Sequence, residues 1–131
     1  MSPIFDWGFA LEILPMLGSA LAITVQATLL GMLVAVTLGL ALALLRRSPF
    51  WPVSALTALV IEFVRSTPLL VQMYFLFYVL PVTGWQMSPL TTGILALGLH
   101  YAAYCAEVYR AGIEAVPRGQ HEAATALNLS R

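Results

Sequence analysis

Residues 17–45 read LGSALAITVQATLLGMLVAVTLGLALALL, and these 29 positions contain no charged side chain. A helix of about 20 apolar residues is long enough to cross the hydrocarbon core of a bilayer, so the stretch is more than sufficient. Gly18, Gly31 and Gly39 interrupt it, and small residues of this kind allow membrane helices to approach one another closely. The stretch therefore predicts a membrane-spanning helix that packs against other helices.

The composition of the whole chain also indicates a membrane protein. Of its 131 residues 60% are hydrophobic and 9% are charged, whereas soluble globular chains are about 45–50% apolar and about 25% charged. The formal net charge is zero, so nothing in the composition favours nucleic acid as a partner. The single cysteine, Cys105, excludes an internal disulfide, and we expect it to have a packing role in an apolar helix.

Two further hydrophobic segments follow the first, so the sequence predicts an all-α fold. We expect a polytopic transmembrane helical bundle of one domain, residues 1–131. The predicted spans are residues 17–45, 53–80 and 90–109, and residues 110–131 form a polar cytoplasmic segment. No positively charged start precedes the first hydrophobic segment, so we expect no cleaved signal and a first segment that stays in the membrane.

The charges at the ends of the spans predict the orientation. Arg46 and Arg47 follow the first span, and three more arginines lie beyond the third span, on the same side of the membrane. Asp6 and Glu12 lie on the other side, together with the charge-free turn 81–89. Because positively charged residues favour the cytoplasm, we expect an outside N-terminus and a cytoplasmic C-terminal segment.

Polar residues inside the second span mark a candidate functional region. Glu62 and Arg65 are three residues apart and are therefore neighbours on one helix face. At a bilayer centre each charge costs roughly 2.5–3.5 kcal/mol, so the two residues form either a structural ion pair or a polar wall of a solute pathway. Pro68, directly after Thr67, predicts a break in the helix, and Gln72 lies one turn beyond it. The break either lines a cavity or serves packing alone.

The third span contains a second polar face. His100, Tyr104 and Glu107 recur at spacings of four and three, which places them on one side of a helix. They form either the lining of a solute pathway or a stripe of interhelical hydrogen bonds. A metal site at His100 is not expected, because no second strong ligand has suitable local spacing. A membrane enzyme using His100 and Glu107 would lack both a nucleophile–base pair and a metal set.

The cytoplasmic segment predicts a short helix on the inner face of the membrane. Pro117 suits the start of a helix, where its missing N–H does no harm. Ala123 and Ala124 suit the body of the helix, and Glu122 lies in its early turns near the positive helix end. From these residues alone, the helix either docks into a partner or only stabilises its own subunit.

This segment closely resembles the Glu-Ala-Ala loop of permease subunits in bacterial ATP-binding cassette importers. The matching residues are Glu122, Ala123 and Ala124, preceded by Val-Pro-Arg-Gly-Gln at 116–120. The resemblance covers almost the whole chain from the first span onward, and it implies the N-terminal part of a type I importer permease fold. Further blocks resemble the polar amino acid uptake branch of the family, namely residues 41–46, 62–72 and 99–113.

The resemblance implies a transport subunit rather than an enzyme. Its coupling residues toward a cytoplasmic ATPase subunit would be Glu122, Ala123, Ala124 and Gly119. ATP would be used by that partner, because this chain has no lysine and no glycine-rich phosphate-binding loop, and we expect no cofactor on it. The implied solute is a polar amino acid or a similar small molecule that crosses a bacterial cytoplasmic (inner) membrane. The candidate pathway residues are Glu62, Arg65, Thr67, Gln72, His100, Tyr104 and Glu107.

The resemblance also implies partners. They are cytoplasmic ATP-binding subunits, a second permease subunit in a homodimer or heterodimer, an extracytoplasmic solute-binding protein, and membrane lipid. The alternative interpretation is a small structural membrane subunit without transport activity, which would not depend on Glu122.

Two features depart from the family pattern. Asn128 stands where the family usually has glycine, and asparagine tolerates a left-handed backbone well enough for the turn to survive. Family members continue with an Ile-x-Leu-Pro element and at least two more spans, whereas this sequence stops at Arg131. We therefore expect these residues not to transport a solute by themselves.

Overall fold

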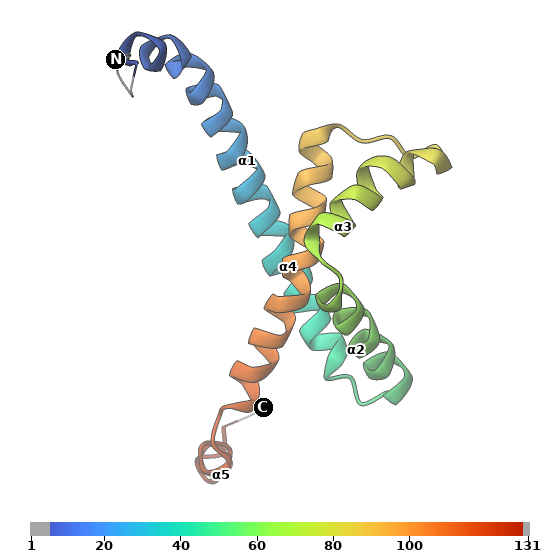
Figure 1. Cartoon of the computed structure of the whole chain (residues 1–131). Helices are drawn as coiled ribbons and strands as arrows, with labels where there is room; N and C mark the ends of the chain where they lie inside the picture. The colour runs from blue at the N-terminus through green and yellow to red at the C-terminus, as the bar shows by residue number, and fades with distance from the viewer. Residues whose placement is uncertain (1–5, 130–131) are drawn as a thin grey trace.

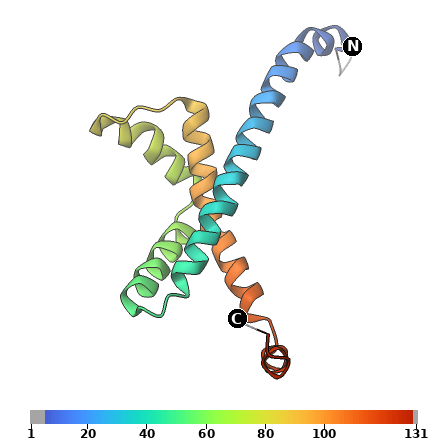
Figure 2. The same cartoon turned by 180° about the vertical axis from the view of Figure 1, so that it is seen from behind.

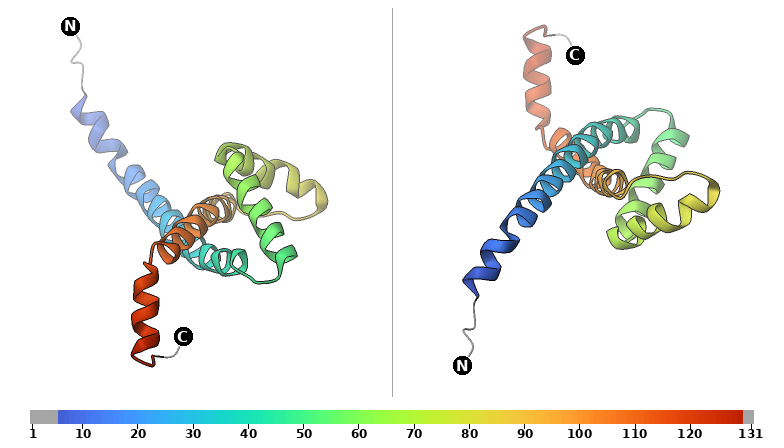
Figure 3. Two further views of the ribbon diagram at one scale, coloured as in Figure 1. Left: turned by 90° about the horizontal axis from the view of Figure 1, so that it is seen from below. Right: turned by 90° about the horizontal axis from the view of Figure 1, so that it is seen from above.

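The computed structural model describes residues 6–129, and within that range the chain is helical with no strand (Figure 1). The all-α prediction is thus confirmed. Two long helices cross one another, two shorter ones form a bent pair beside the crossing, and the last lies apart beyond it (Figures 1, 2 and 3). The elements are α1 (Trp7–Arg46), α2 (Trp51–Ser66), α3 (Leu69–Tyr74), a π-helical turn η1 (Phe75–Val79), a 3-10 turn η2 (Leu80–Thr83), α4 (Pro89–Glu114) and α5 (Arg118–Ala126).

Side-chain caps define where the two long helices begin. The Asp6 carboxylate accepts hydrogen bonds from the backbone N–H groups of Gly8 (2.9 Å) and Phe9 (3.1 Å) at the start of α1. The Ser88 hydroxyl accepts one from the N–H of Thr91 (3.1 Å) at the start of α4. Each cap accepts hydrogen bonds from N–H groups that have no partner inside the helix, and this stabilises the first turn and defines where the helix begins.

The crossing of α1 and α4 is built from small residues. The buried residues of α1 recur every four positions, which places them in one row along the helix. These residues are Gly31, Ala35, Gly39 and Ala43. The buried residues of α4 include the corresponding row Gly98, Ala102 and Ala106. Small side chains in both rows allow the two backbones to come close together, as in many membrane helix pairs.

Two glycines at the crossing leave no room for a side chain. A Cβ atom on Gly39 would lie 2.6 Å from Cys105 Cβ and 2.9 Å from the Ala102 carbonyl oxygen. A Cβ atom on Gly98 would lie 2.5 Å from Val34 Cγ1. Because the Ala102 oxygen belongs to a helix backbone, it cannot move aside as a flexible side chain could. The separation of α1 and α4 is therefore set by the absence of side chains at these positions.

A small apolar core joins α2 to this pair. Ala43, Ile61, Ala103 and Ala106 are almost completely buried and lie in one cluster contributed by α1, α2 and α4. The large apolar side chains lie mainly on the outer surface of the molecule. Such an arrangement suits a protein whose surroundings are lipid rather than water, because an apolar exterior costs no hydration there.

The predicted spans correspond unequally to the observed helices. α1 contains residues 17–45 and begins ten residues earlier, and α4 contains residues 90–109. The segment 53–80 is not one helix, because α2 and the helical stretch from Leu69 to Thr83 meet at an angle of 98°. Among the described residues, α1 alone is long and apolar enough to cross a membrane, with this bent pair as a second span if it is counted as one. The number of three spans stays a prediction.

Replacing Gly39 by alanine should destabilise the α1–α4 pair. The new methyl group would overlap Cys105 and the Ala102 carbonyl, which we expect to cost about 1–3 kcal/mol. The control is Gly18→Ala, since a Cβ atom there meets nothing within 4 Å and alanine favours helix by roughly 0.5–1 kcal/mol. Equilibrium unfolding in mixed detergent micelles measures both, and equal stability of the two variants would contradict this account of the crossing.

Candidate functional site

The break between α2 and α3 lies at Thr67 and Pro68. Both residues have extended backbone conformations, with ψ angles of 126° and 137°. This is the break that Pro68 predicted, because a proline disfavours helical geometry at the residue before it. The last backbone carbonyl groups of α2 then have no partner within the helix and need other hydrogen-bond donors. Inside the hydrocarbon core of a membrane, water cannot supply these donors.

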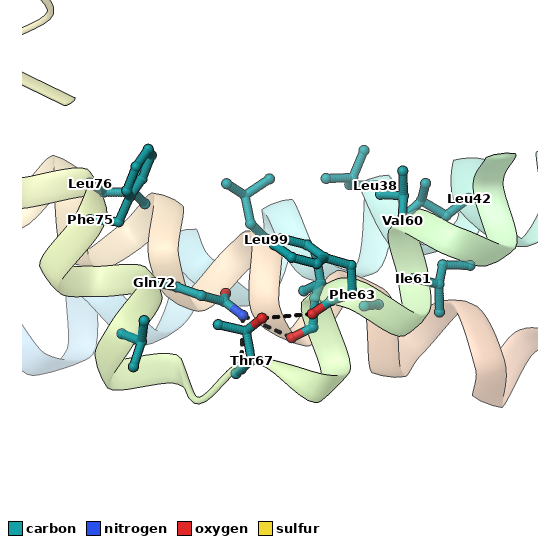
Figure 4. A pocket seen from close by; sticks show the side chains of 13 residues that line it. Leu38, Leu42, Val60, Ile61, Phe63, Thr67, Gln72, Phe75, Leu76 and Leu99 are labelled. Atoms are coloured by element: carbon teal, nitrogen blue, oxygen red, sulfur yellow. Dashed lines mark hydrogen bonds between the residues drawn. The ribbon is translucent and has the colours of Figure 1, made fainter. Parts of the chain in front are cut away.

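Side chains satisfy these carbonyl groups. The Thr67 hydroxyl donates to the Phe63 carbonyl at 2.8 Å. The Gln72 side-chain amide donates to the carbonyls of Val64 (2.8 Å) and Thr67 (3.0 Å), so that a residue of α3 reaches back across the break (Figure 4). Thr67 and Gln72 were predicted as pathway residues, and the structure places both at the break with their donors engaged by backbone.

Tyr104 connects the same helix end to α4. Its hydroxyl donates to the Arg65 carbonyl at 3.5 Å, and the Arg65 guanidinium lies 5.2 Å from the centre of the Tyr104 ring. At this distance the cation is attracted to the face of the aromatic ring. The break is therefore held from two directions, by Gln72 of α3 and by Tyr104 of α4.

Glu62 and Arg65 form a loose pair beside this contact. Arg65 Nη1 lies 4.0 Å from Glu62 Oε2, and the Ser66 hydroxyl lies 3.5 Å from Glu62 Oε1. The Glu62 side chain is 73% exposed and that of Arg65 is 37% exposed. The expected neighbours on one helix face are thus observed. Both charged groups remain accessible to a ligand or to a neighbouring chain.

His100 lies next to Tyr104 on α4. Its ring centre is 5.2 Å from that of Tyr104 and 5.3 Å from that of Tyr101. Its Nδ1 atom is buried and makes no hydrogen bond within residues 6–129. His100 follows Gly98 by two residues, or about 200° around the helix, so it lies opposite the face that contacts α1. Arg65, Tyr104 and His100 thus form one group on the outer side of the crossing.

Glu107 belongs to a different group. Arg110 donates to Glu107 Oε2 from Nη2 (2.8 Å) and from Nε (2.9 Å), and its Nη1 donates to Glu114 at 2.6 Å. A carboxylate held by two donors of one guanidinium is well satisfied within its own helix. These ion pairs were not predicted, although Arg110 follows Glu107 by three residues and precedes Glu114 by four, which are the spacings of helical ion pairs.

An apolar pocket of about 530 Å³ lies between the broken helix, α1 and α4 (Figure 4). Leu38, Phe63, Phe75 and Leu99 are among its lining residues. Thr67 and Gln72 also line it, but their side-chain donors point to backbone carbonyls. None of the described lining residues is charged, so Arg65, Glu62 and His100 lie outside this pocket. The charged group and the apolar pocket are therefore separate features near the break.

The predicted cytoplasmic helix is α5, which begins at Arg118 directly after Pro117. Its C-terminal end has the hydrogen bonds of a Schellman motif, from the N–H of Leu129 to the Ala124 carbonyl and from that of Asn128 to the Thr125 carbonyl, both 3.0 Å. Asn128 has a φ angle of 54°, so the expected left-handed turn at this asparagine is confirmed.

α5 packs against no other helix among residues 6–129 (Figure 3). Three of the four predicted coupling residues, Gly119, Glu122 and Ala123, are exposed, and Ala124 is half-buried. Leu127, just beyond the helix, is 72% exposed. A helix with a defined end and no packing partner can offer its surface to another protein.

Comparison with known proteins identifies the family. The model of the family "Binding-protein-dependent transport system inner membrane component" matches residues 27–131. The chain belongs to this family of inner-membrane components, and it is therefore an inner-membrane protein. The family predicted from the sequence is thus confirmed.

Individual relatives agree with this assignment. The "Probable amino-acid ABC transporter permease protein y4tG" of Sinorhizobium fredii is 50% identical over 128 residues, which are 95% of this chain and 54% of the relative. The "Arginine transport system permease protein ArtQ" of Bacillus subtilis is 33% identical over 125 residues, which are 95% of this chain and 57% of that protein. This chain thus spans little more than half the length of these relatives.

A solved structure has the same fold. It is titled "Crystal structure of an amino acid ABC transporter with histidines", and it matches with a TM-score of 0.89 and 35% sequence identity. The match covers 98% of this chain and 60% of the chain in that structure. The arrangement of α1 to α5 is therefore that of an amino acid ABC transporter chain.

Replacing Gln72 by leucine should loosen the broken helix. The Thr67 carbonyl would lose the Gln72 amide, and an unsatisfied buried acceptor costs about 1–3 kcal/mol, whereas the Val64 carbonyl would keep only its 3.3 Å bond from the Thr67 N–H. We expect a broader distribution of distances between spin labels placed on α2 and on η1. The control is Gln26→Leu, the same chemical change at an exposed position of α1, which should leave the distribution unchanged. Equal broadening in both variants would argue against a role of Gln72 in the break.

Proposed function

We propose that this chain is the membrane-spanning part of an ATP-driven importer, which moves a polar amino acid or a similar small solute across the cytoplasmic membrane. The arginine named for one relative supports a polar amino acid as the solute. The chain would cross the membrane several times with its N-terminus outside, because Arg46 and Arg47 lie at the end of α1. A second permease subunit and an extracytoplasmic solute-binding protein would complete the pathway.

The observation that carries this proposal is the isolation of α5. The helix lies beyond α4, contacts no other helix of the described chain and exposes Glu122, and Leu127 directly after it is exposed as well (Figure 1). A helix that served only its own subunit would be expected to pack against that subunit. We propose that α5 inserts into a groove of a cytoplasmic ATPase subunit, with Glu122, Ala123 and Ala124 at the contact and Gly119 giving close approach. ATP would be hydrolysed on that partner.

The ion pairs near the end of α4 support such coupling. Arg110 binds Glu107 and Glu114 together, and this ion-pair network keeps the end of α4 helical up to the short connection before Pro117. A movement of the ATPase would then be transmitted to α4 rather than lost in a flexible end. In this proposal Glu107 contributes to force transmission and not to recognition of the solute.

The solute pathway would follow the group at the end of α2. Glu62 and Arg65 are only loosely paired and their side chains are accessible, so both retain capacity for hydrogen bonds to a polar solute, and His100 lies beside them against Tyr104. Thr67 and Gln72 would act through the shape of the break, since their donors are already engaged. Tyr104 would keep Arg65 in place through its ring and its hydroxyl group.

Replacing Glu122 by alanine should weaken capture of the ATPase subunit. We expect at least about a tenfold loss in affinity, equivalent to roughly 1.4 kcal/mol, when the detergent-extracted chain is used to pull down the ATPase subunits of its own organism. Glu12→Ala is the matched control, since it removes an exposed acid at the opposite end of the molecule. Capture that is equal for both variants would support a structural membrane subunit instead.

Replacing Arg65 by methionine should affect transport without affecting assembly. Methionine keeps the length and apolar stem of the side chain, whereas the charge that faces Tyr104 and Glu62 is lost. We expect uptake of solute by the assembled importer to fall at least about tenfold, with ATPase capture unchanged. Arg47→Met, at an exposed arginine, is the control. Normal uptake by the Arg65 variant would exclude this residue from the pathway.

A further inference from the structure

The first helix is far longer than a membrane crossing requires. Its 40 residues extend about 60 Å at 1.5 Å per residue, whereas the hydrocarbon core of a bilayer is about 30 Å thick. The buried residues of α1 begin only at Gly31, and nearly all positions before it are exposed. The packing of the molecule therefore does not account for the N-terminal turns of this helix.

The first turns of α1 run in a different direction from the rest. The ribbon bends near its N-terminus, so that the opening turns lie across the axis of the long part (Figures 1 and 2). Pro15 lies within the helix and cannot donate a backbone hydrogen bond, which is a usual cause of such a bend. The segment from residue 7 to residue 16, here called the N-terminal arm, is thus distinct from the part of α1 that reaches α4.

The N-terminal arm carries its one acidic residue, Glu12, on a side without large apolar residues. Gly8, Glu12 and Pro15 follow one another at spacings of four and three, so they lie along one side of the helix. Trp7 and the two residues at the same spacings, Leu11 and Leu14, lie along a neighbouring side and are 75%, 69% and 59% exposed. A helix with a single acidic side chain, Glu12, and an otherwise apolar surface matches neither bulk water nor the centre of a bilayer.

We propose that the N-terminal arm lies in the interfacial layer of the bilayer, with Trp7, Leu11 and Leu14 toward the acyl chains and Glu12 toward water. Two observations select lipid as the occupant of this apolar surface. The arm is continuous with a helix whose next 29 residues carry no charge and are long enough to cross a membrane, so it begins close to the bilayer surface. Tryptophan is also enriched at this depth, where its ring is amphipathic.

This position of the arm has a consequence for α1. A segment held in the interface at one end fixes the depth and the tilt of the helix that follows, so the arm would set the level at which Gly39 meets α4. The inference rests on membrane insertion of the chain and not on transport. Its failure would therefore leave the proposed function untouched.

Depth-dependent fluorescence quenching tests the proposal. Trp51→Phe and Trp85→Phe together leave Trp7 as the single tryptophan of the full chain, which is then reconstituted into phosphatidylcholine vesicles. Lipids brominated near the headgroup end of the acyl chain should quench Trp7 at least about twofold more than lipids brominated near the methyl end. A second chain that also carries Trp7→Phe and Leu29→Trp should show the reverse order, since Leu29 lies in the middle of the charge-free stretch.

Two results would overturn the proposal. Strong quenching of Trp7 by aqueous acrylamide without quenching by either lipid would place the arm in water, free for a soluble protein partner. Strongest quenching by the deep bromines would make the arm part of a straight span.

A pair of variants tests the orientation of the arm. Leu11→Gln should at least halve the shallow quenching, whereas Glu12→Gln should leave it unchanged, and equal effects of both would refute the assigned sides.

Discussion

The close contact between α1 and α4 is the constraint on which the remaining structure depends. In lipid, helices are not driven together by burial of apolar surface, so their association rests on the fit of their surfaces. Gly39 and Gly98 provide this fit, because each occupies a position where even a methyl group would overlap the other helix. The apolar core that includes Ile61 of α2 is then assembled around the pair, and α2 has a fixed place beside it.

The broken helix is possible because the structure pairs the carbonyl groups that it exposes. An interrupted helix at membrane depth is tolerated only where protein groups replace the missing backbone partners. Thr67 does this within α2, Gln72 does it from α3, and Tyr104 does it from α4. Since Tyr104 belongs to the helix that crosses α1, the position of the break is tied to the crossing, and Arg65 and His100 both come to lie against Tyr104 as a result.

Much of this arrangement could be predicted from local signals in the sequence. Pro68 indicated the break, Pro117 the start of the last helix, and Asn128 its left-handed end, because each depends on the conformational limits of one residue. The partners of Gly39, the carbonyls bound by Gln72 and the contact of Arg65 with Tyr104 could not be predicted, since they join segments far apart in the chain. The early start of α1 was not predicted, because Glu12 and Pro15 interrupt the apolar sequence before residue 17, whereas the helix begins at the Asp6 cap.

The location of the crossing along α4 has a mechanical consequence. Ala102 lies near the middle of this 26-residue helix, about 20 Å from its first residue and about 18 Å from its last. A tilt about the Gly39 contact therefore gives a lever with arms of nearly equal length. The end that leads to α5 and the end at Ser88 would move by similar distances in opposite directions, so a displacement on one side of the molecule is neither amplified nor reduced on the other.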